Sequence, residues 1–341
     1  MAYTTIDNPE LYFQTKIYSG DGSTDVSHTF DGDEDMQANM IWFKRRNGSA
    51  NHFLYDSVRG ANRSLVPNDT DVEATSGEQT EYLSSFDSDG FTLGHASNNV
   101  NGSGQSYVAW AWVESATAGF DMVLYTGNGS NRTISHSLSA KPAMMIVKQR
   151  SASRDWWVYN KNLDGTDGAT GVMYLSTTDA AGTGATTSWN STAPTTSVFS
   201  LGTTVGVNAD SGTYINYLFS EVQGYSKFGK YTGTADSDGP FIYTGFRPAF
   251  FLYKNSSSGS EEWKILDNKR DSFNRGSQRN LVVHDARAES DDTNSIGEFV
   301  SNGVKIRSSH NNINESSDTF IYMAFAEQPF VNSNGVPNNA R

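Results

Sequence analysis

The residues that could carry out chemistry do not form a recognisable catalytic motif. The six histidines show no recurring spacing to acids of the kind that a metal site or a catalytic base needs. Serine and threonine are abundant, but no Gly-x-Ser-x-Gly elbow presents a nucleophile between a strand and a helix. Nothing singles out two of the 38 Asp and Glu residues as the carboxylate pair of a glycosidase. The sequence therefore favours a protein that is not an enzyme and needs no cofactor.

One acidic run has the composition of a cation site. It contains Asp31, Asp33 and Asp35. An EF-hand loop that began at Asp31 would need glycine at its sixth position and glutamate at its twelfth, where the sequence has Met36 and Trp42. The EF-hand pattern fails, so we expect a solvated acidic turn. A looser metal site with oxygen ligands from the three aspartates is the alternative.

Two tryptophans in polar surroundings are candidates for binding glycan. Trp156 is followed by Trp157, so in a strand the two rings would point to opposite faces and one of them could be exposed. Trp189 lies in a polar loop. An aromatic ring with hydrogen-bonding neighbours can stack on a sugar. The sequence therefore offers Trp156 and Trp189 as glycan-binding residues, although a loop plug or a subunit contact is the interpretation that we favour.

The elements that would position these residues repeat along the chain. An aromatic-small-glycine turn begins at Tyr18, Tyr125 and Tyr231, which are 107 and 106 residues apart. An apolar run then ends in a lysine, and an aromatic strand, here called the closing strand, ends each copy. The lysines are Lys44, Lys148 and Lys254, and the closing strands are residues 107–112, 214–219 and 320–325. Three landmarks in one order predict three copies of a single module.

The alternation of side chains predicts how these strands are buried. Val108, Trp110 and the residues equivalent to them form an apolar face of the closing strand, which we expect to be core. The opposite face, with Tyr107 and Ala109, is smaller or more polar and should be covered only in part. The run that ends in lysine is apolar on both faces, as in a central strand, and Lys44, Lys148 and Lys254 should mark its emergence into water.

These patterns predict an all-β chain of three tandem homologous antiparallel β-sandwich modules, jelly-roll or lectin-like in topology. Aromatic and β-branched residues favour strands, and glycine and asparagine favour the turns between them. The expected division is an N-terminal anchoring segment at 1–17, an acidic first module at 18–117, a second module at 118–223, and a third module with a C-terminal tail at 224–341.

Charge and composition exclude several classes of function. The net charge is −13, of which residues 1–117 hold −11, and no module is net basic. Nucleic acid and anionic membrane are therefore not expected as partners. The chain has no cysteine, which excludes disulfides and thiolate metal sites. No apolar stretch is long enough to be inserted in a membrane, and residues 1–7 lack the features of a signal peptide.

Residues 125–130, 134–136, 141–142 and 146–148 of the second copy together form a distinctive pattern. This pattern resembles a repeat of virion and tail-fibre-like structural proteins of marine, cyanophage-like bacteriophages. Residues 12–16 and 54–60 are similar to the starts of such proteins. The third copy matches loosely, because it lacks the histidine equivalent to His136 and its glycine turn is shorter. The resemblance implies a place on a virus particle and does not specify a chemistry.

The repeat and the resemblance together imply a structural protein of a bacteriophage virion, assembled in the cytoplasm of the host bacterium. A tail appendage or tail fibre that serves particle assembly and host attachment is the first expectation. A lectin-like receptor-binding protein for host-surface glycan and a capsid decoration or head-fibre protein are the alternatives. Residues 1–17 would bind other virion proteins. Homo-oligomers, with trimers favoured, would bury the partly covered sheet faces.

Overall fold

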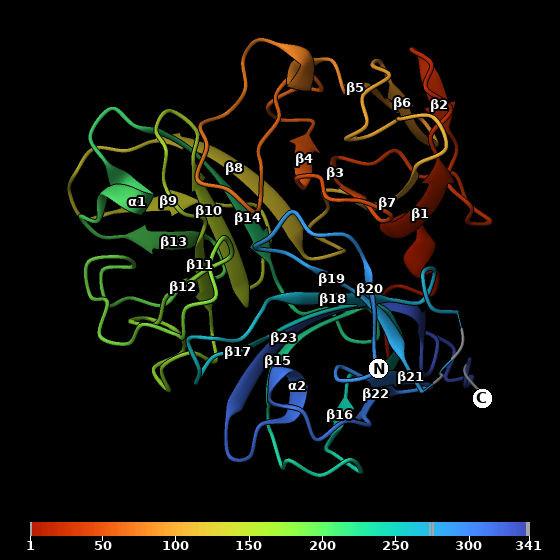
Figure 1. Cartoon of the computed structure of the whole chain (residues 1–341). Coiled ribbons are helices and arrows are strands. Elements are labelled where there is room, and N and C mark those ends of the chain that lie inside the picture. The colour runs from red at the N-terminus through yellow and green to blue at the C-terminus, as the bar shows by residue number, and fades with distance from the viewer. Residues whose placement is uncertain (1, 273, 275, 339–341) are drawn as a thin grey trace.

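The fold is all-β and consists of several antiparallel sheets joined by long loops (Figure 1). The computed structural model describes residues 2–272, 274 and 276–338. The helical elements within these residues are short: η1 (Pro9–Leu11), η2 (Glu78–Thr80), α1 (Val205–Asn208) and α2 (Asn311–Asn314). No helix in this part of the chain is long and apolar enough to cross a membrane.

Three large sheets contain most of the strands. The first has the order β1 (Phe13–Ser19), β7 (Ser106–Trp112), β3 (Met40–Arg45) and β4 (Phe53–Asp56). The second has the order β8 (Phe120–Thr126), β14 (Thr213–Phe219), β10 (Met144–Gln149), β11 (Trp157–Asn160) and β12 (Met173–Tyr174). The third has the order β15 (Ser226–Thr232), β23 (Thr319–Pro329), β17 (Phe246–Asn255), β18 (Lys264–Asp267), β19 (Gln278–Val282) and β20 (Ser290–Asp292).

A small sheet accompanies each large one. The first small sheet is β2 (Val26–His28), β6 (Gly90–Leu93) and β5 (Leu83–Asp87). The second is β9 (Arg132–Ser135) with β13 (Val198–Leu201), and the third is β16 (Phe241–Tyr243), β22 (Gly303–Ile306) and β21 (Gly297–Val300). We call each large sheet with its small sheet a sheet system. Figure 1 shows the first system at the upper right, the second at the left and the third at the bottom.

The three large sheets share one strand order and one register. In each, the strand with the glycine turn pairs with the closing strand, which also pairs with the strand that carries the lysine. The opening tyrosine of each sheet stacks on the first aromatic ring of the closing strand, with ring centroids 5.1, 5.0 and 4.8 Å apart. The three pairs are Tyr18–Tyr107, Tyr125–Tyr214 and Tyr231–Phe320. The landmarks of the sequence therefore occupy equivalent places.

The glycine turn is structural in all three sheets. The hydroxyl group of the opening tyrosine donates a hydrogen bond to a backbone oxygen 82 residues later, in Val100, Val207 and Ile313 respectively. A wholly buried asparagine follows that acceptor each time and accepts a hydrogen bond from the turn backbone; these are Asn101, Asn208 and Asn314. A side chain on the first turn glycine, such as Gly127, would clash with the opposing carbonyl. The turn is thereby tied to the loop before the closing strand.

Both faces of the closing strand are buried, so the expectation of a partly covered face was wrong. In the first system Tyr107, Ala109 and Ala111 pack between the large and small sheets. Val108 and Trp110 face the other way, into a core that residues of all three systems share. Alternation identified the two faces correctly, but it could not reveal that a second layer covers each of them.

The shared core lies where the three large sheets meet. The ring of Phe325 in β23 is 5.8 Å from that of Trp112 in β7 and 6.1 Å from that of Phe219 in β14, measured between centroids. It is also 5.3 Å from Phe13 in β1. A small apolar cavity of about 20 Å³ at this centre is lined by residues of all three sheets. One face of each sheet is thus buried by the other two systems.

The expected boundary of the N-terminal segment at residue 17 was also wrong. β1 begins at Phe13, so residues 13–17 belong to the first large sheet. The residues before β1 pack on the third sheet system, where the Tyr3 hydroxyl group donates to the carbonyl oxygen of Gly245 at 2.8 Å. Ile6 joins the shared core. Figure 1 accordingly shows the described start of the chain beside the third small sheet.

We predict that replacing Phe325 with alanine lowers the free energy of unfolding by about 3–5 kcal/mol, because a buried ring that contacts three sheets leaves a cavity. Tryptophan fluorescence, which reports mainly on the first two systems, should shift its denaturation midpoint together with circular dichroism. Leu124→Ala, at a side chain that is 41% exposed, is the control and should change stability by no more than about 0.5 kcal/mol. An unchanged fluorescence midpoint for Phe325→Ala would contradict the shared core.

Candidate functional site

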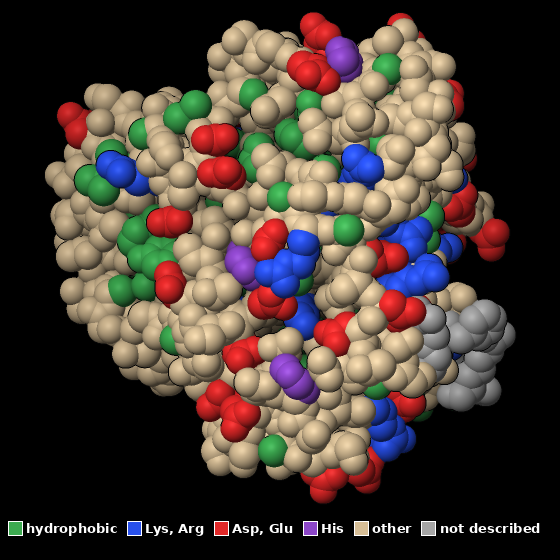
Figure 2. Space-filling model, in the orientation of Figure 1, with side chains coloured by type: hydrophobic (Ala, Val, Ile, Leu, Met, Phe, Trp, Pro, Cys, Tyr) green, Lys and Arg blue, Asp and Glu red, His purple; other side chains and the backbone are tan. Residues whose placement is uncertain are grey.

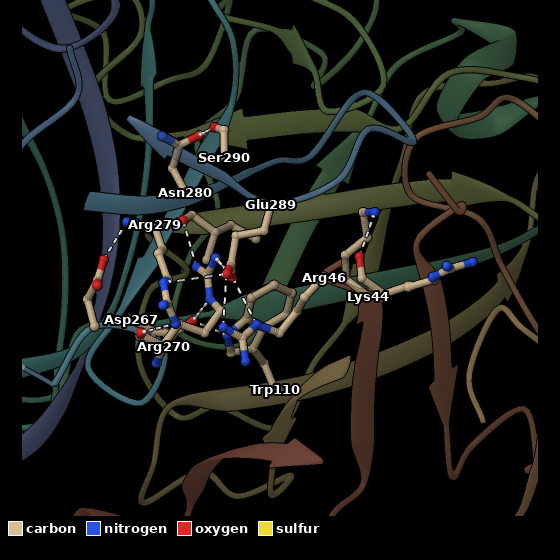
Figure 3. A network of polar contacts seen from close by, with 12 residues as sticks. Lys44, Arg46, Trp110, Asp267, Arg270, Arg279, Asn280, Glu289 and Ser290 are labelled. Carbon is tan, nitrogen blue, oxygen red and sulfur yellow. Dashed lines mark hydrogen bonds and ion pairs between the residues drawn. The ribbon is translucent and has the colours of Figure 1, made fainter. Parts of the chain in front are cut away.

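A buried polar network joins the first and third sheet systems (Figure 3). Asp267 ends β18, and Arg270, three residues later, donates to its carboxylate at 2.5 Å with both side chains fully buried. Arg270 also pairs with Glu289 at 3.1 Å. From the first system, Arg46 binds the same Glu289 carboxylate through two nitrogens, at 3.0 and 2.9 Å, and the Trp110 indole donates to Asp267 at 3.0 Å.

The charges in this network support one another. Burial opposes the ionisation of Glu289, but the hydrogen bonds from Arg46 and the charge of Arg270 outweigh it and hold the pKa of this carboxyl below its usual value. Burial also disfavours the charged form of Arg270, yet Asp267 and Glu289 raise the pKa of its guanidinium. The guanidinium lies 5.5 Å from the centre of the Trp110 ring. Glu289 and Arg270 therefore stay charged at neutral pH.

The same network occurs between the first and second systems. Asp56 ends β4, and Arg59 binds it at 2.5 Å and Glu73 at 3.1 Å. From the second system Arg150 binds Glu73 at 2.7 Å, and the Tyr217 hydroxyl group donates to Asp56 at 2.6 Å. Each member holds the place that its counterpart holds in the other network. Two of the three contacts between systems thus use one arrangement of acids and arginines.

The third contact, between the second and third systems, replaces the ion pair with uncharged residues. The position equivalent to Asp56 is Asn160, which opposes the first residue of β10 as Asp56 opposes the first residue of β3. Three residues later Leu163 takes the place of the arginine and packs against the shared core. A backbone hydrogen bond from Ala181 to Ser256, at 2.9 Å, links the two systems here. This contact contains the same strands without the charges.

The chemistry of these networks suits holding the sheet systems together. Arginine stays protonated at neutral pH, and neither network presents a nucleophile to solvent. A buried ion pair adds little net stability compared with an apolar contact, but losing one partner is costly. Because the partners come from different systems, only one relative placement of those systems satisfies every charge. We therefore assign the networks to positioning the sheet systems.

The three repeated lysines are buried, which corrects the expectation that they emerge into water. Lys148 donates to the carbonyl oxygens of Thr70 and Arg154 at 2.8 and 2.5 Å. Lys44 donates to Ala286 at 3.2 Å, in a loop of the third system, and Lys254 also donates to backbone carbonyls. Burial lowers the pKa of each lysine to about 8. The lysines hold loops to the ends of the central strands.

The two tryptophans expected to bind glycan are fully buried, so neither can stack on a sugar. The Trp156 indole donates to the carbonyl oxygen of Val66 at 3.0 Å and lines the central cavity. The Trp189 indole donates to Gly171 at 2.8 Å, and its ring packs edge-on against Tyr159. Polar sequence neighbours suggested exposure, but long-range packing decides the burial of both rings. The loop-plug interpretation describes Trp189 correctly.

The acidic run lies on the surface, between β2 and β3. Asp31, Asp33 and Asp35 are exposed, and Asp31 pairs with Lys16 at 2.5 Å. No group of three or more His, Cys, Asp or Glu side chains among the described residues is arranged to hold a metal ion. The structure therefore provides no support for a cation site at these aspartates.

Aromatic side chains that reach solvent lie elsewhere. Trp157, next to Trp156, is half-buried and packs edge-on against Tyr174 at 5.0 Å. Figure 2 shows hydrophobic side chains gathered over α1, β11 and β13. Phe241 and Tyr243 in β16 are 47% and 54% exposed. Sequence analysis missed this pair, although two aromatic residues separated by one apolar residue indicate a strand with an aromatic outer face.

We predict that Arg270→Met lowers the free energy of unfolding by about 3–5 kcal/mol, because it leaves the buried Asp267 carboxylate without its cation and removes one of the arginines that bind Glu289. Arg59→Met should cost a similar amount. The matched control is Leu163→Met, at the uncharged equivalent position, with an expected cost below about 1.5 kcal/mol. Urea denaturation of the full chain measures all three. Equal costs for the arginine and leucine variants would show that the buried ion pairs contribute nothing specific to the stability of the fold.

We also predict that stability rises with pH in the weakly alkaline range. The pKa of each lysine is 10.5 in the unfolded chain and about 8 in the folded one. Between pH 8 and 10 the unfolded chain therefore binds more protons at these lysines than the folded chain does. The free energy of unfolding should therefore rise by at least about 1 kcal/mol from pH 7.5 to 9.5. Above pH 10 it should fall, because burial raises the pKa of tyrosines such as Tyr217 and only the unfolded chain loses those protons.

Urea denaturation across this pH range tests the lysine effect. Lys148→Met should reduce the rise by about one third, since it removes one of three equivalent groups. A midpoint that stays level or falls between pH 7.5 and 9.5 would contradict the assignment of buried, proton-releasing lysines.

Comparison with known proteins places the whole assembly in one family. A search of curated proteins finds no match. The match to a family model covers residues 8–329, from the residue before η1 to the end of β23. The family unit therefore includes all three sheet systems. The chain belongs to the family described as a domain of unknown function, DUF7483.

Proposed function

We propose that this chain is a structural component of a bacteriophage virion, most simply a tail appendage or tail fibre. The observation that carries the proposal is the mutual locking of three equivalent sheet systems by a shared core and buried ion pairs. A particle component must keep its shape after it leaves the cell, and in this chain, which has no cysteine, the shared core and the buried ion pairs would provide that rigidity. The resemblance of its repeat to virion proteins supports the same role.

We further infer that the three sheet systems are copies of one antiparallel β-sandwich module. The shared strand order, the equivalent tyrosine pairs and the repeated asparagine support this interpretation. A core between the large and small sheets, as in the first system, is the packing of a β-sandwich. Tandem copies give a rigid body of repeated surfaces, which suits an appendage that positions other parts.

Assembly with other virion proteins would use surfaces that remain exposed. Residues 1–17 are our proposed contact, although several of their side chains pack on the third system. Leu11, which is 42% exposed, is the outward apolar residue of this segment. A homotrimer remains a proposal, and it must use other surfaces than the inner sheet faces, which the chain buries by itself.

A lectin-like receptor-binding role is the second candidate. The observation that favours it is the exposed aromatic pair Phe241 and Tyr243, because solvent-facing rings on a strand can stack on sugars. A capsid decoration or head-fibre protein is the third candidate, and its position on the particle separates it from the first.

Antibody labelling of intact particles tests the virion proposal. Purified particles produced from the genome that encodes this chain would be labelled with gold-conjugated antibody and imaged by electron microscopy. We predict gold at the tail or its fibres. Gold on the head would favour the decoration role. Absence of label from intact particles, with the protein found only in the soluble fraction of the lysate, would contradict a virion component.

A further inference from the structure

The outer face of β16 carries the aromatic side chains that are most exposed in the described part of the chain. Phe241 and Tyr243 are about half exposed, while Ile242 between them is buried and opposes Val304 of β22. An exposed aromatic ring does not contribute the free energy that its burial would add to folding. Two exposed rings on one strand therefore indicate a site for a ligand or a partner. Their alternation places both rings on the same side of the third small sheet.

The second sheet system provides an internal comparison. Its equivalent strand is β9, where Ile134 faces inward and opposes Phe199 as Ile242 opposes Val304. The outward residues on either side of Ile134 are Thr133 and Ser135, and both are exposed. The same strand is therefore compatible with small polar residues at these places. The aromatic pair is an addition specific to the third system and is not required by the fold.

Neighbouring residues hold the two rings in place. The Tyr3 hydroxyl group lies 3.3 Å from that of Tyr243 and donates to the carbonyl oxygen of Gly245. Gly303 on β22 has no side chain beside Phe241, and a Cβ atom there would approach the ring to 2.9 Å. The rings are thus fixed before any ligand arrives, which lowers the entropy cost of binding.

We call the side chains of Tyr3, Phe241 and Tyr243 the aromatic platform. An open depression adjoins this platform. Tyr3 belongs to both, and the other residues that line the depression are Ala2, Gln223, Ser333, Asn334 and Gly335. Amide and hydroxyl groups of this kind can both donate and accept hydrogen bonds. A ligand that lies on the rings can therefore extend over groups that match alcohol functions.

The charges beside Phe241 neutralise one another. Lys305, which opposes Phe241, pairs with Asp238 at 3.0 Å. Arg307 pairs with Asp238 at 2.5 Å and with Glu298 at 2.9 Å. These two cations and two anions thus bind each other, while the carboxylate of Asp7, which accepts hydrogen bonds from Ser333 of the depression, adds a negative charge. A neutral ligand fits this surface better than an acidic one.

We propose that the platform binds a neutral saccharide. The C–H face of a pyranose ring stacks on an aromatic ring, and its hydroxyl groups bind the amide and hydroxyl groups of the adjoining depression. A protein partner would need a wide apolar surface, whereas ion pairs flank these rings. The inference deepens the attachment role proposed above by naming the class of receptor and the residues that contact it.

The competing aromatic surface at Trp157 is less suitable. Its ring packs perpendicular to that of Tyr174 at 5.0 Å and lies against Gly206, where a Cβ atom would clash with the indole. Trp157 also packs against the core of the second system. These contacts occupy the side chain structurally, and Trp157 serves as the control in the test of the platform.

The test measures binding of the full chain to an array of neutral and sialylated oligosaccharides, followed by calorimetry with the strongest neutral binder. The double variant Phe241→Thr, Tyr243→Ser carries the residue types that β9 has at its two outward positions, so it should fold normally. Its urea denaturation midpoint checks this. We expect the variant to bind at least about tenfold more weakly than the unchanged protein, and Trp157→Phe to bind within about twofold of it.

Three results would overturn the proposal. They are the absence of binding to any neutral oligosaccharide at millimolar concentration, binding that the double variant leaves unchanged, and a preference for sialylated ligands. Self-association that the double variant abolishes, without saccharide binding, would assign the platform to a protein contact instead. Each of these results leaves the virion assignment intact, because antibody labelling of particles measures location independently of ligand binding.

Discussion

The burial of one face of each large sheet against the other two systems is the constraint on which the rest of the structure depends. A sheet with two apolar faces needs two covering layers. The small sheet covers one face, and the shared core around Trp112, Phe219 and Phe325 covers the other. Without that second layer, each sheet system would expose aromatic residues to water. A single chain therefore achieves within itself the packing that separate subunits of a trimer would otherwise provide.

Apolar packing alone would tolerate more than one relative placement of the systems, and the polar networks restrict that freedom. Glu289 is bound by Arg270 from its own system and by Arg46 from the first. Glu73 is bound by Arg59 and Arg150 in the equivalent way. A displacement of one system would leave charges buried without partners, which is costly. The proposed attachment role requires this rigidity, because a receptor platform on the third system is useful only if its direction relative to the particle is fixed.

The sequence predicted the all-β class, the positions of the closing strands and the two faces of each, because aromatic alternation directly reflects strand geometry. It did not predict what covers the face in the shared core, since the covering residues lie about a hundred positions or more away. Trp189 and Lys148 illustrate the same limit. The polar loop around Trp189 and the strand end at Lys148 both suggested exposed side chains. In the structure both side chains are buried, and each donates a hydrogen bond to a carbonyl oxygen elsewhere in the chain. The alternation of residues around Ile242 would have predicted that Phe241 and Tyr243 face outward, but the sequence analysis missed this pair.

Native-state hydrogen exchange of the three closing strands tests the shared core most directly. The side chains of β7, β14 and β23 pack in one shared core, and the amide protons of these strands lie in ladders with neighbouring strands, so their exchange should require opening of the whole structure. The account predicts that the slowest amides of all three strands exchange with the same free energy, within about 1 kcal/mol, and respond equally to denaturant. A closing strand that exchanges at a clearly lower free energy than the other two would show an independently opening module and contradict the account.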